Sequence, residues 1–178
     1  MAYYLNKPIV IQDYDPQWRQ LYAVEEQHLW EVLTPIAVQI EHIGSTSVPG
    51  LAAKPIIDIS VSVRDLADVT TFVPGMIDLG YEEVPINPAF QRRLFCKGPY
   101  NEGTHHVHFT IHGSEVWAEP ILFRDYLRAH PDAAAWYQQV KHDAAARHQI
   151  DLNGYHDEKS GCVVTLMEQA HTWQMNEK

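Results

Sequence analysis

His106 and His108 are two histidines separated by one residue, and side chains spaced in this way can do chemistry together. In a β-strand such residues point to the same side, with Cα atoms roughly 6–7 Å apart. Two imidazole rings placed there can share a metal ion, or they can contact phosphate and transfer protons. The alternative is a pair of half-exposed strand histidines that bind nothing.

Asp58 is an acidic residue inside a segment, residues 56–63, that otherwise alternates like a half-buried strand. One face carries only apolar side chains, namely Ile57, Ile59, Val61 and Val63, so Asp58 lies with Ser60 on the more polar face. A buried carboxylate is costly unless it has a partner. Asp58 is therefore either a structural residue bonded to the nearby turn or to a lysine, or a metal ligand or catalytic group. The polar faces of this segment and of residues 104–111 could line the same cleft.

The turn that precedes this strand is made of small polar residues: Gly44, Ser45, Thr46 and Ser47. Glycine permits a positive φ and the close approach of a ligand, and the N–H and hydroxyl groups of such a turn can hold phosphate. The spacing and the Lys-Ser/Thr ending of a P-loop are absent. The turn is thus either a phosphate cradle or a polar turn that satisfies its own hydrogen bonds.

Several cationic residues are candidate anion contacts, above all Lys54, Arg124 and Lys159. Arg124 and Arg128 are four residues apart, as are Tyr155 and Lys159, so each pair shares one face of a helix. For most of these side chains a solvated surface charge is the alternative interpretation.

The elements that must position these residues follow from periodicity and from turn signals. We expect strands at residues 38–43, 56–63, 81–84, 92–97 and 104–111. We expect helices from Asp15-Pro16 to Pro35 and at residues 65–79, 115–129, 131–148 and 155–173. This order predicts an α+β fold, a mixed β-sheet backed by helices, with three helices at the C-terminus.

Composition limits the classes of function. The chain has 178 residues, and we expect one domain, 1–178. Its formal net charge of −10 argues against a broad nucleic-acid surface but allows a small local anion site. We expect no membrane span, since no long apolar run is present, and no secretory signal. Cys96 and Cys162 show no metal-type spacing, and a reducing, cytoplasmic compartment is the simplest interpretation.

Three parts of the sequence together resemble the GrpB (UPF0157) family. They are the run from His42 to Ile59, with its Gly44-Ser45-Thr46-Ser47 turn, the motif His106-Val107-His108, and the run from Phe123 to Pro131, and the Tyr155 to Lys159 pair agrees with them. The resemblance covers nearly the whole chain. It implies a nucleotidyltransferase-like fold of the polymerase-β type, in which a Gly-Ser turn helps to hold a triphosphate and an acidic pair binds divalent metal. The family is sometimes joined to a dephospho-coenzyme A kinase domain.

The chain departs from that superfamily pattern at its acidic residues. Gly44 and Ser45 match the turn and Asp58 matches the first acid, but Ser60 stands at the second acidic position. His106 and His108 stand where a later carboxylate is expected. One Asp and two His form a poor site for two Mg²⁺ ions and a better one for a single divalent metal, Mg²⁺, Mn²⁺ or Zn²⁺, with the softer ions favoured.

Two functions follow from the resemblance and from this departure. The first is a metal-dependent enzyme that transfers a nucleotidyl or phosphoryl group, with Asp58, His106 and His108 as metal ligands or acid–base groups. In it Gly44 and Ser45, with Thr46 and Ser47, would cradle phosphate, and Lys54, Arg124 or Lys159 would neutralise charge. The second is a module that binds a nucleotide or phosphorylated small molecule without transfer chemistry. A partner-binding protein with a relict cleft is a third possibility, and the oligomeric state is open.

Overall fold

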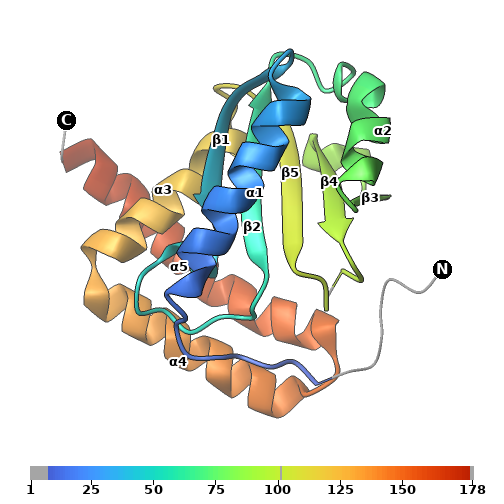
Figure 1. The fold of residues 1–178 in the computed structure, drawn as a ribbon. Helices are drawn as coiled ribbons and strands as arrows, with labels where there is room; N and C mark the ends of the chain where they lie inside the picture. Colours follow the sequence, from blue (N-terminus) through green and yellow to red (C-terminus); the bar gives the residue numbers. More distant parts are fainter. Residues whose placement is uncertain (1–7, 101, 177–178) are drawn as a thin grey trace.

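Five strands form one mixed sheet in the computed structural model, which describes residues 8–100 and 102–176 (Figure 1). The strands are β1 (Ala37–Ile43), β2 (Ile57–Val63), β3 (Glu82–Val84), β4 (Arg92–Lys97) and β5 (His105–Ile111), in the order β1-β2-β5-β4-β3. β2 and β5 are parallel, and all other neighbouring strands are antiparallel. The parallel register places Asp58 opposite His106 and Ser60 opposite His108.

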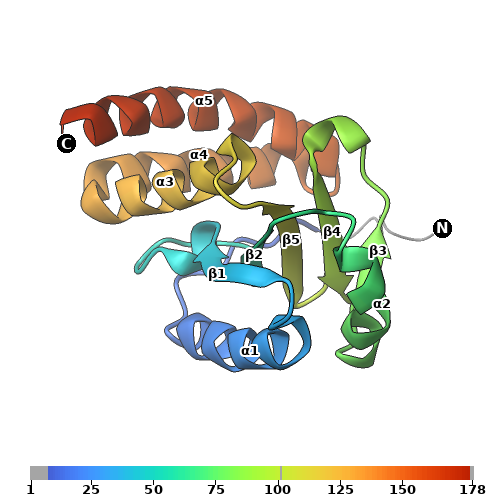
Figure 2. The same cartoon turned by 90° about the horizontal axis from the view of Figure 1, so that it is seen from above.

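Helices cover both faces of the sheet (Figure 2). α1 (Gln17–Leu33) and α2 (Val69–Asp78) lie on one face, and the other carries α3 (Glu115–Ala129), α4 (Pro131–His148) and α5 (Leu152–Asn176). Two short 3₁₀ helices, η1 (Ser45–Ser47) and η2 (Pro88–Phe90), lie in the connections. The expected α+β plan is thus confirmed, including its C-terminal helices.

The main hydrophobic core lies between the sheet and α1 with α2. The apolar face of β2 packs there with Val107 and Phe109 of β5 and with Trp18 and Leu29 of α1. Because side chains alternate along a strand, the burial of this face turns Asp58 and Ser60 of β2, and His106 and His108 of β5, toward α3, α4 and α5. A second core joins these three helices to the segment after η1.

Two helices begin three or four residues away from the predicted start. The helix expected from residue 65 begins only at Val69, because the Asp65 carboxylate accepts a hydrogen bond from Ala67 N (2.8 Å) and holds a turn ahead of the helix. The last helix was expected from residue 155 but begins at Leu152. Asn-Gly pairs are typical of turns, yet the Asp151 carboxylate accepts from Gly154 N (3.1 Å) and lets the helix start before this pair.

Within residues 8–100 and 102–176, no helix combines the length and the apolar character that crossing a bilayer requires. Cys96 and Cys162 are both buried free thiols. The first seven residues, where no secretory signal is expected, lie outside the described part of the chain.

Candidate metal and phosphate site

Asp58, His106 and His108 converge where β2 and β5 begin. Asp58 Oδ1 lies 3.2 Å from His106 Nδ1 and 3.7 Å from His108 Nε2. One potential ligand atom from each residue falls within 4.8 Å of the other two. Metal–ligand bonds of about 2.0–2.2 Å span donor atoms up to roughly 4.4 Å apart, so small side-chain rotations close the group around one ion.

The second ring nitrogen of His106 is already committed. Its Nε2 donates to the backbone carbonyl of Tyr100 (2.7 Å), and the Tyr100 ring stacks on the imidazole at 4.9 Å. A carbonyl that accepts from one nitrogen orients the other toward a metal ion, an arrangement common around metal-binding histidines. His106 is therefore held with Nδ1 directed at Asp58, which fits a metal ligand.

The same contacts set the charges in the absence of metal. Burial lowers the pKa of His106, but the hydrogen bond and negative charge of Asp58 outweigh it and raise that pKa to about 10. Burial alone would raise the pKa of Asp58, yet the two histidines hold it far below its usual range. His108 has its pKa lowered by burial. A metal ion bound to His106 would take the place of its Nδ1 proton.

The Gly44 turn is packed directly against this group. Gly44 has a φ of 71°, which favours glycine, and a Cβ added there would lie 2.5 Å from Asp58 Oδ2. Thr46 donates to the carbonyl of Ile56 (3.3 Å), and the Ser47 hydroxyl donates to Gly44 O (2.5 Å). The turn thus satisfies part of its own hydrogen bonding and also fixes the position of the Asp58 carboxylate.

Replacing Gly44 with alanine should therefore damage the site as well as the fold. The added Cβ is strained at positive φ and displaces the carboxylate of Asp58 from the two histidines. We expect Gly44→Ala to lose about 1–3 kcal/mol of stability and to lose metal binding. Gly113→Ala is the control, because it also has a positive φ (77°) but nothing lies within 4 Å of its added Cβ. Thermal unfolding with and without Mn²⁺ measures both effects, and normal metal binding by Gly44→Ala would contradict this packing.

Three lysines and an arginine surround the Asp58 group. A cavity of about 540 Å³ is lined by residues from the start of β2 and β5 and from the helices α4 and α5. Its lining includes Lys54, Arg92, Lys141 and Lys159, and Asp58 provides its one carboxylate among the described residues. The Tyr155 ring lies close to two of these cations, with its centroid 5.6 Å from Lys54 Nζ and 5.7 Å from Lys159 Nζ. The cavity is therefore strongly cationic in a chain of net charge −10.

Lys141 connects this cationic group to the turn. Only 2% of it is exposed, and its ammonium donates to the Ser45 hydroxyl (3.0 Å) and to the carbonyl of Ala52. Burial first, and then the charge of Lys159, lower the pKa of Lys141 to about 7. Burial and Lys159 likewise lower the pKa of Lys54 to about 8. A negative charge added beside either amine would stabilise its protonated form.

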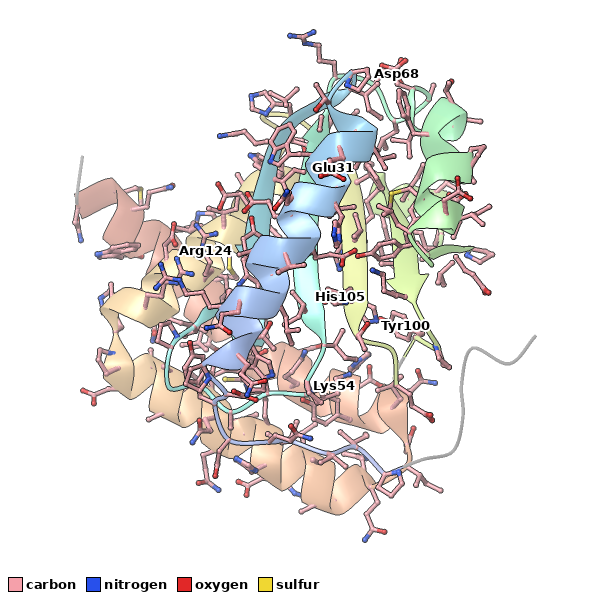
Figure 3. The ribbon with its side chains drawn as sticks, in the orientation of Figure 1. Glu31, Lys54, Asp68, Tyr100, His105 and Arg124 are labelled. Atoms are coloured by element: carbon pink, nitrogen blue, oxygen red, sulfur yellow. The ribbon has the colours of Figure 1, made fainter. Side chains whose placement is uncertain are left out.

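Most of the residues singled out in the sequence meet at this cavity: Ser45, Thr46, Lys54, Asp58, His106, His108 and Lys159 line it, and Gly44 lies against Asp58. Arg124 and Ser47 lie elsewhere, on a second hollow beside β1. Figure 3 shows Lys54 and Tyr100 near the lower edge of the sheet, and Arg124, a residue of α3, away from them. Arg124 is bonded to Glu41 (2.7 Å), Asp125 (2.8 Å) and the carbonyl of His42 (2.9 Å), which gives it a structural role.

Two residues of the candidate site were not predicted from the sequence, namely Lys141 and Tyr100. Lys141 lies in a helix with no clear apolar stripe, so nothing indicated that it points inward. Tyr100 acts through its backbone carbonyl and its ring stacking, and the spacing of residues in a loop reveals neither.

His42 lines the second hollow, and its burial predicts that stability depends on pH. Its Nε2 lies 3.0 Å from Thr46 Oγ1, and its ring stacks on Tyr22 at 4.6 Å. Burial lowers the pKa of His42 from 6.5 to about 4, although the Asp58 charge opposes this. Between these values the unfolded chain binds a proton that the folded chain does not, so stability is lost as pH falls.

We expect His42 to lower the free energy of unfolding by up to about 3 kcal/mol as pH falls from 6.5 to 4. His42→Gln cannot take up a proton there and should show a flatter dependence. Urea unfolding at a series of pH values measures the slope. An identical slope in wild type and variant would contradict a neutral, buried His42.

Comparisons of the sequence and of the structure with known proteins identify the same family. Residues 8–169 match the family described as GrpB protein. The UPF0157 protein YqkA of Bacillus subtilis (strain 168) is 39% identical over 171 residues, 96% of this chain and 50% of YqkA, so the chain spans about half the length of that relative. The conserved protein GrpB from Enterococcus faecalis has a crystal structure with a TM-score of 0.86 at 32% identity, covering 93% of this chain and 99% of that one.

A more distant likeness concerns the fold alone. Cid1 poly(U) polymerase with Mg 3'-dATP bound has a TM-score of 0.57 at 17% identity, covering 83% of this chain and 49% of that one. The fold is thus nucleotidyltransferase-like, and the chain belongs to the GrpB family.

Proposed function

We propose that the cavity binds a nucleotide or another phosphorylated small molecule together with one divalent metal ion. The observation that supports this best is the arrangement of charge. Four cationic side chains and a single carboxylate line the cavity among the described residues. Of these cations, Lys141 donates hydrogen bonds to the Ser45 hydroxyl and to the Ala52 carbonyl, which are both neutral groups. A cavity with this charge distribution favours the binding of a polyanion.

Phosphate groups fit this cavity better than carboxylates do. Lys54, Lys141 and Lys159 reach it from three separate segments, so they can contact several oxygens of one extended anion. The Ser45 hydroxyl lies beside Lys141 and can donate to the same group. A volume of about 540 Å³ is within the range of small-molecule sites.

Asp58, His106 and His108 would hold the metal ion next to this anion. The residues fit one ion of the borderline class, Mn²⁺ or Zn²⁺, better than a pair of Mg²⁺ ions, since two of the three ligands are imidazoles. Such an ion neutralises phosphate charge and polarises a phosphoryl oxygen. The lysines then orient the phosphate chain, and the turn at Gly44 keeps Asp58 in place. The reaction that this arrangement suits is nucleotidyl or phosphoryl transfer.

A second candidate is a module that binds the same ligand without transferring a group. Ser60 supports it, because two-metal transfer needs further carboxylates, and Ser60 stands where the superfamily places the second one. Ser60 is 1% exposed, and it is not among the residues that line the cavity.

Thermal unfolding separates these functions from a protein without a ligand. The melting temperature is measured with Mg²⁺, Mn²⁺ or Zn²⁺, each alone and with ATP, CTP or coenzyme A. A ligand of the folded state raises it by mass action, and we expect metal and nucleotide together to raise it more than either alone. No rise with any combination would contradict both functions. Binding without turnover would favour the module, provided that product formation in Asp58→Ala does not differ from that in wild type.

A further inference from the structure

Three buried polar atoms on the two strands that carry the metal group, β2 and β5, have no hydrogen-bond partner among the described residues. They are Ser60 Oγ, His108 Nδ1 and Thr110 Oγ1. Ser60 and Thr110 are each 1% exposed. Buried polar atoms in folded proteins nearly always have a partner, and an unsatisfied group indicates a bound water molecule or ion. Three such atoms in one place call for a common explanation.

Strand register shows that these atoms share one small region. Ser60 of β2 is paired with His108 of the parallel strand β5, so both side chains leave the same face about 4.8 Å apart at the backbone. Thr110 follows two positions along β5 and leaves that face too. α3 packs over β5 on this side. The three side chains therefore leave neighbouring positions of one face, with the space between them under α3, and none of the three atoms bonds to another.

We propose that an enclosed water molecule occupies this space and bonds to Ser60, His108 and Thr110, and that it positions His108 as a metal ligand. Three polar partners are the usual number for a buried water. The positioning role rests on the proposed metal function; the water site itself does not. It makes Ser60 and Thr110 positioning residues, which act through His108 and touch no ligand of the cavity.

The chemistry of His108 explains why water suits this place. Its Nε2 is directed at Asp58 (3.7 Å), so Nδ1 is the nitrogen that faces the buried space. When Nε2 ligates a metal, the ring proton resides on Nδ1 and needs an acceptor. Without metal, Nε2 can carry the proton and Nδ1 needs a donor. Water and hydroxyl groups can both donate and accept, so this cluster accommodates either tautomer without moving the ring.

Substitutions that remove one hydroxyl each test the proposal. Ser60→Ala and Thr110→Val keep the shape of the site and take away one partner of the water. Ser62→Ala is the matched control. Ser62 is a buried hydroxyl on the same face of β2, but it is already bonded to Gln39 N (3.1 Å) and His112 Nδ1 (3.1 Å). Melting temperature without metal and Mn²⁺ affinity are measured for all three variants and for wild type.

We expect Ser60→Ala and Thr110→Val to melt at a lower temperature than wild type and to bind Mn²⁺ about 10–100-fold more weakly. Ser62→Ala should keep wild-type Mn²⁺ affinity. A higher melting temperature for Ser60→Ala or Thr110→Val would overturn the proposal, because removing a truly unsatisfied hydroxyl is stabilising. Unchanged Mn²⁺ affinity in both variants would overturn the positioning role.

These experiments distinguish failure of the proposed metal function from failure of the proposed water site. If wild type binds no metal, the proposed function and the positioning role both fall, while the sign of the melting-temperature change still decides whether the water is bound. A crystal structure of the wild-type protein gives the direct view. Density for a water within hydrogen-bond distance of all three atoms supports the proposal, and a direct Ser60–His108 hydrogen bond in its place overturns it.

Discussion

Asp58→Asn is expected to weaken Mn²⁺ binding by more than about 100-fold while the protein stays folded. Partners that only orient a metal ligand are worth about 10–100-fold in affinity, and Asp58 provides the one carboxylate of the group. Asparagine keeps the shape of the side chain but removes the charge that attracts the cation. Titration of Mn²⁺ followed by calorimetry measures the affinity, and the metal-dependent rise in melting temperature gives a second value.

The control for this variant lies on the same strand. His105 is next to His106, but its side chain leaves the opposite face of β5, where Glu25 and Lys97 are its charged neighbours. His105→Gln should therefore bind Mn²⁺ as wild type does, even if its stability changes. If Asp58→Asn kept its affinity, or if His105→Gln lost it to the same extent, the assignment of these three residues as the metal site would be wrong.

Lys141→Met is expected to weaken the binding of ATP about 10–100-fold. A hydrogen bond to a charged group contributes about 1.5–3 kcal/mol, which corresponds to this range of affinity. Lys141 lies beside Ser45 and has its pKa lowered to about 7 by burial, so an incoming phosphate both gains a contact and restores the ammonium charge. Calorimetric titration with ATP in buffers of different ionisation enthalpy should show proton uptake near pH 7 in wild type and less uptake in the variant.

Lys97→Met serves as the matched control for Lys141. Lys97 is also partly buried, but it lies on the other face of the sheet and donates to Glu25 (2.7 Å). Its loss removes the lysine partner of Glu25 and leaves this buried carboxylate with the Tyr81 hydroxyl (2.8 Å) and, at 3.8 Å, the His28 imidazole, so stability should fall while ATP affinity is retained. Equal ATP affinity in wild type and Lys141→Met would contradict the proposal that the lysines form the phosphate site.

The sequence was sufficient to predict the strands but not their register. Alternation over residues 56–63 and 104–111 revealed which faces were apolar, because one face of each strand is buried. The pairing of Asp58 with His106 joins segments 48 residues apart, and it depends on how the intervening helix and strands are arranged. The sequence therefore indicated that a common cleft was possible, and the structure provided the distances.

Charged side chains were harder to place than apolar ones. Arg124 and Lys159 were indistinguishable as candidate anion contacts, since each lies in a helix with an aromatic or charged neighbour one turn away. In the structure Glu41 and Asp125 bind Arg124, whereas Lys159 lines the cavity. The sequence did not indicate a role for Lys141, because a lysine in a polar helix is usually exposed. Only tertiary packing decides which of these charges is buried.

The most direct test of the proposed site is a crystal structure of the protein grown with Mn²⁺ and ATP, with anomalous diffraction recorded for the metal. We expect one anomalous peak bonded to Asp58, His106 and His108, with the phosphate chain extending toward Lys54, Lys141 and Lys159. A peak at another position, or none at these three residues in the presence of saturating Mn²⁺, would contradict the central claim.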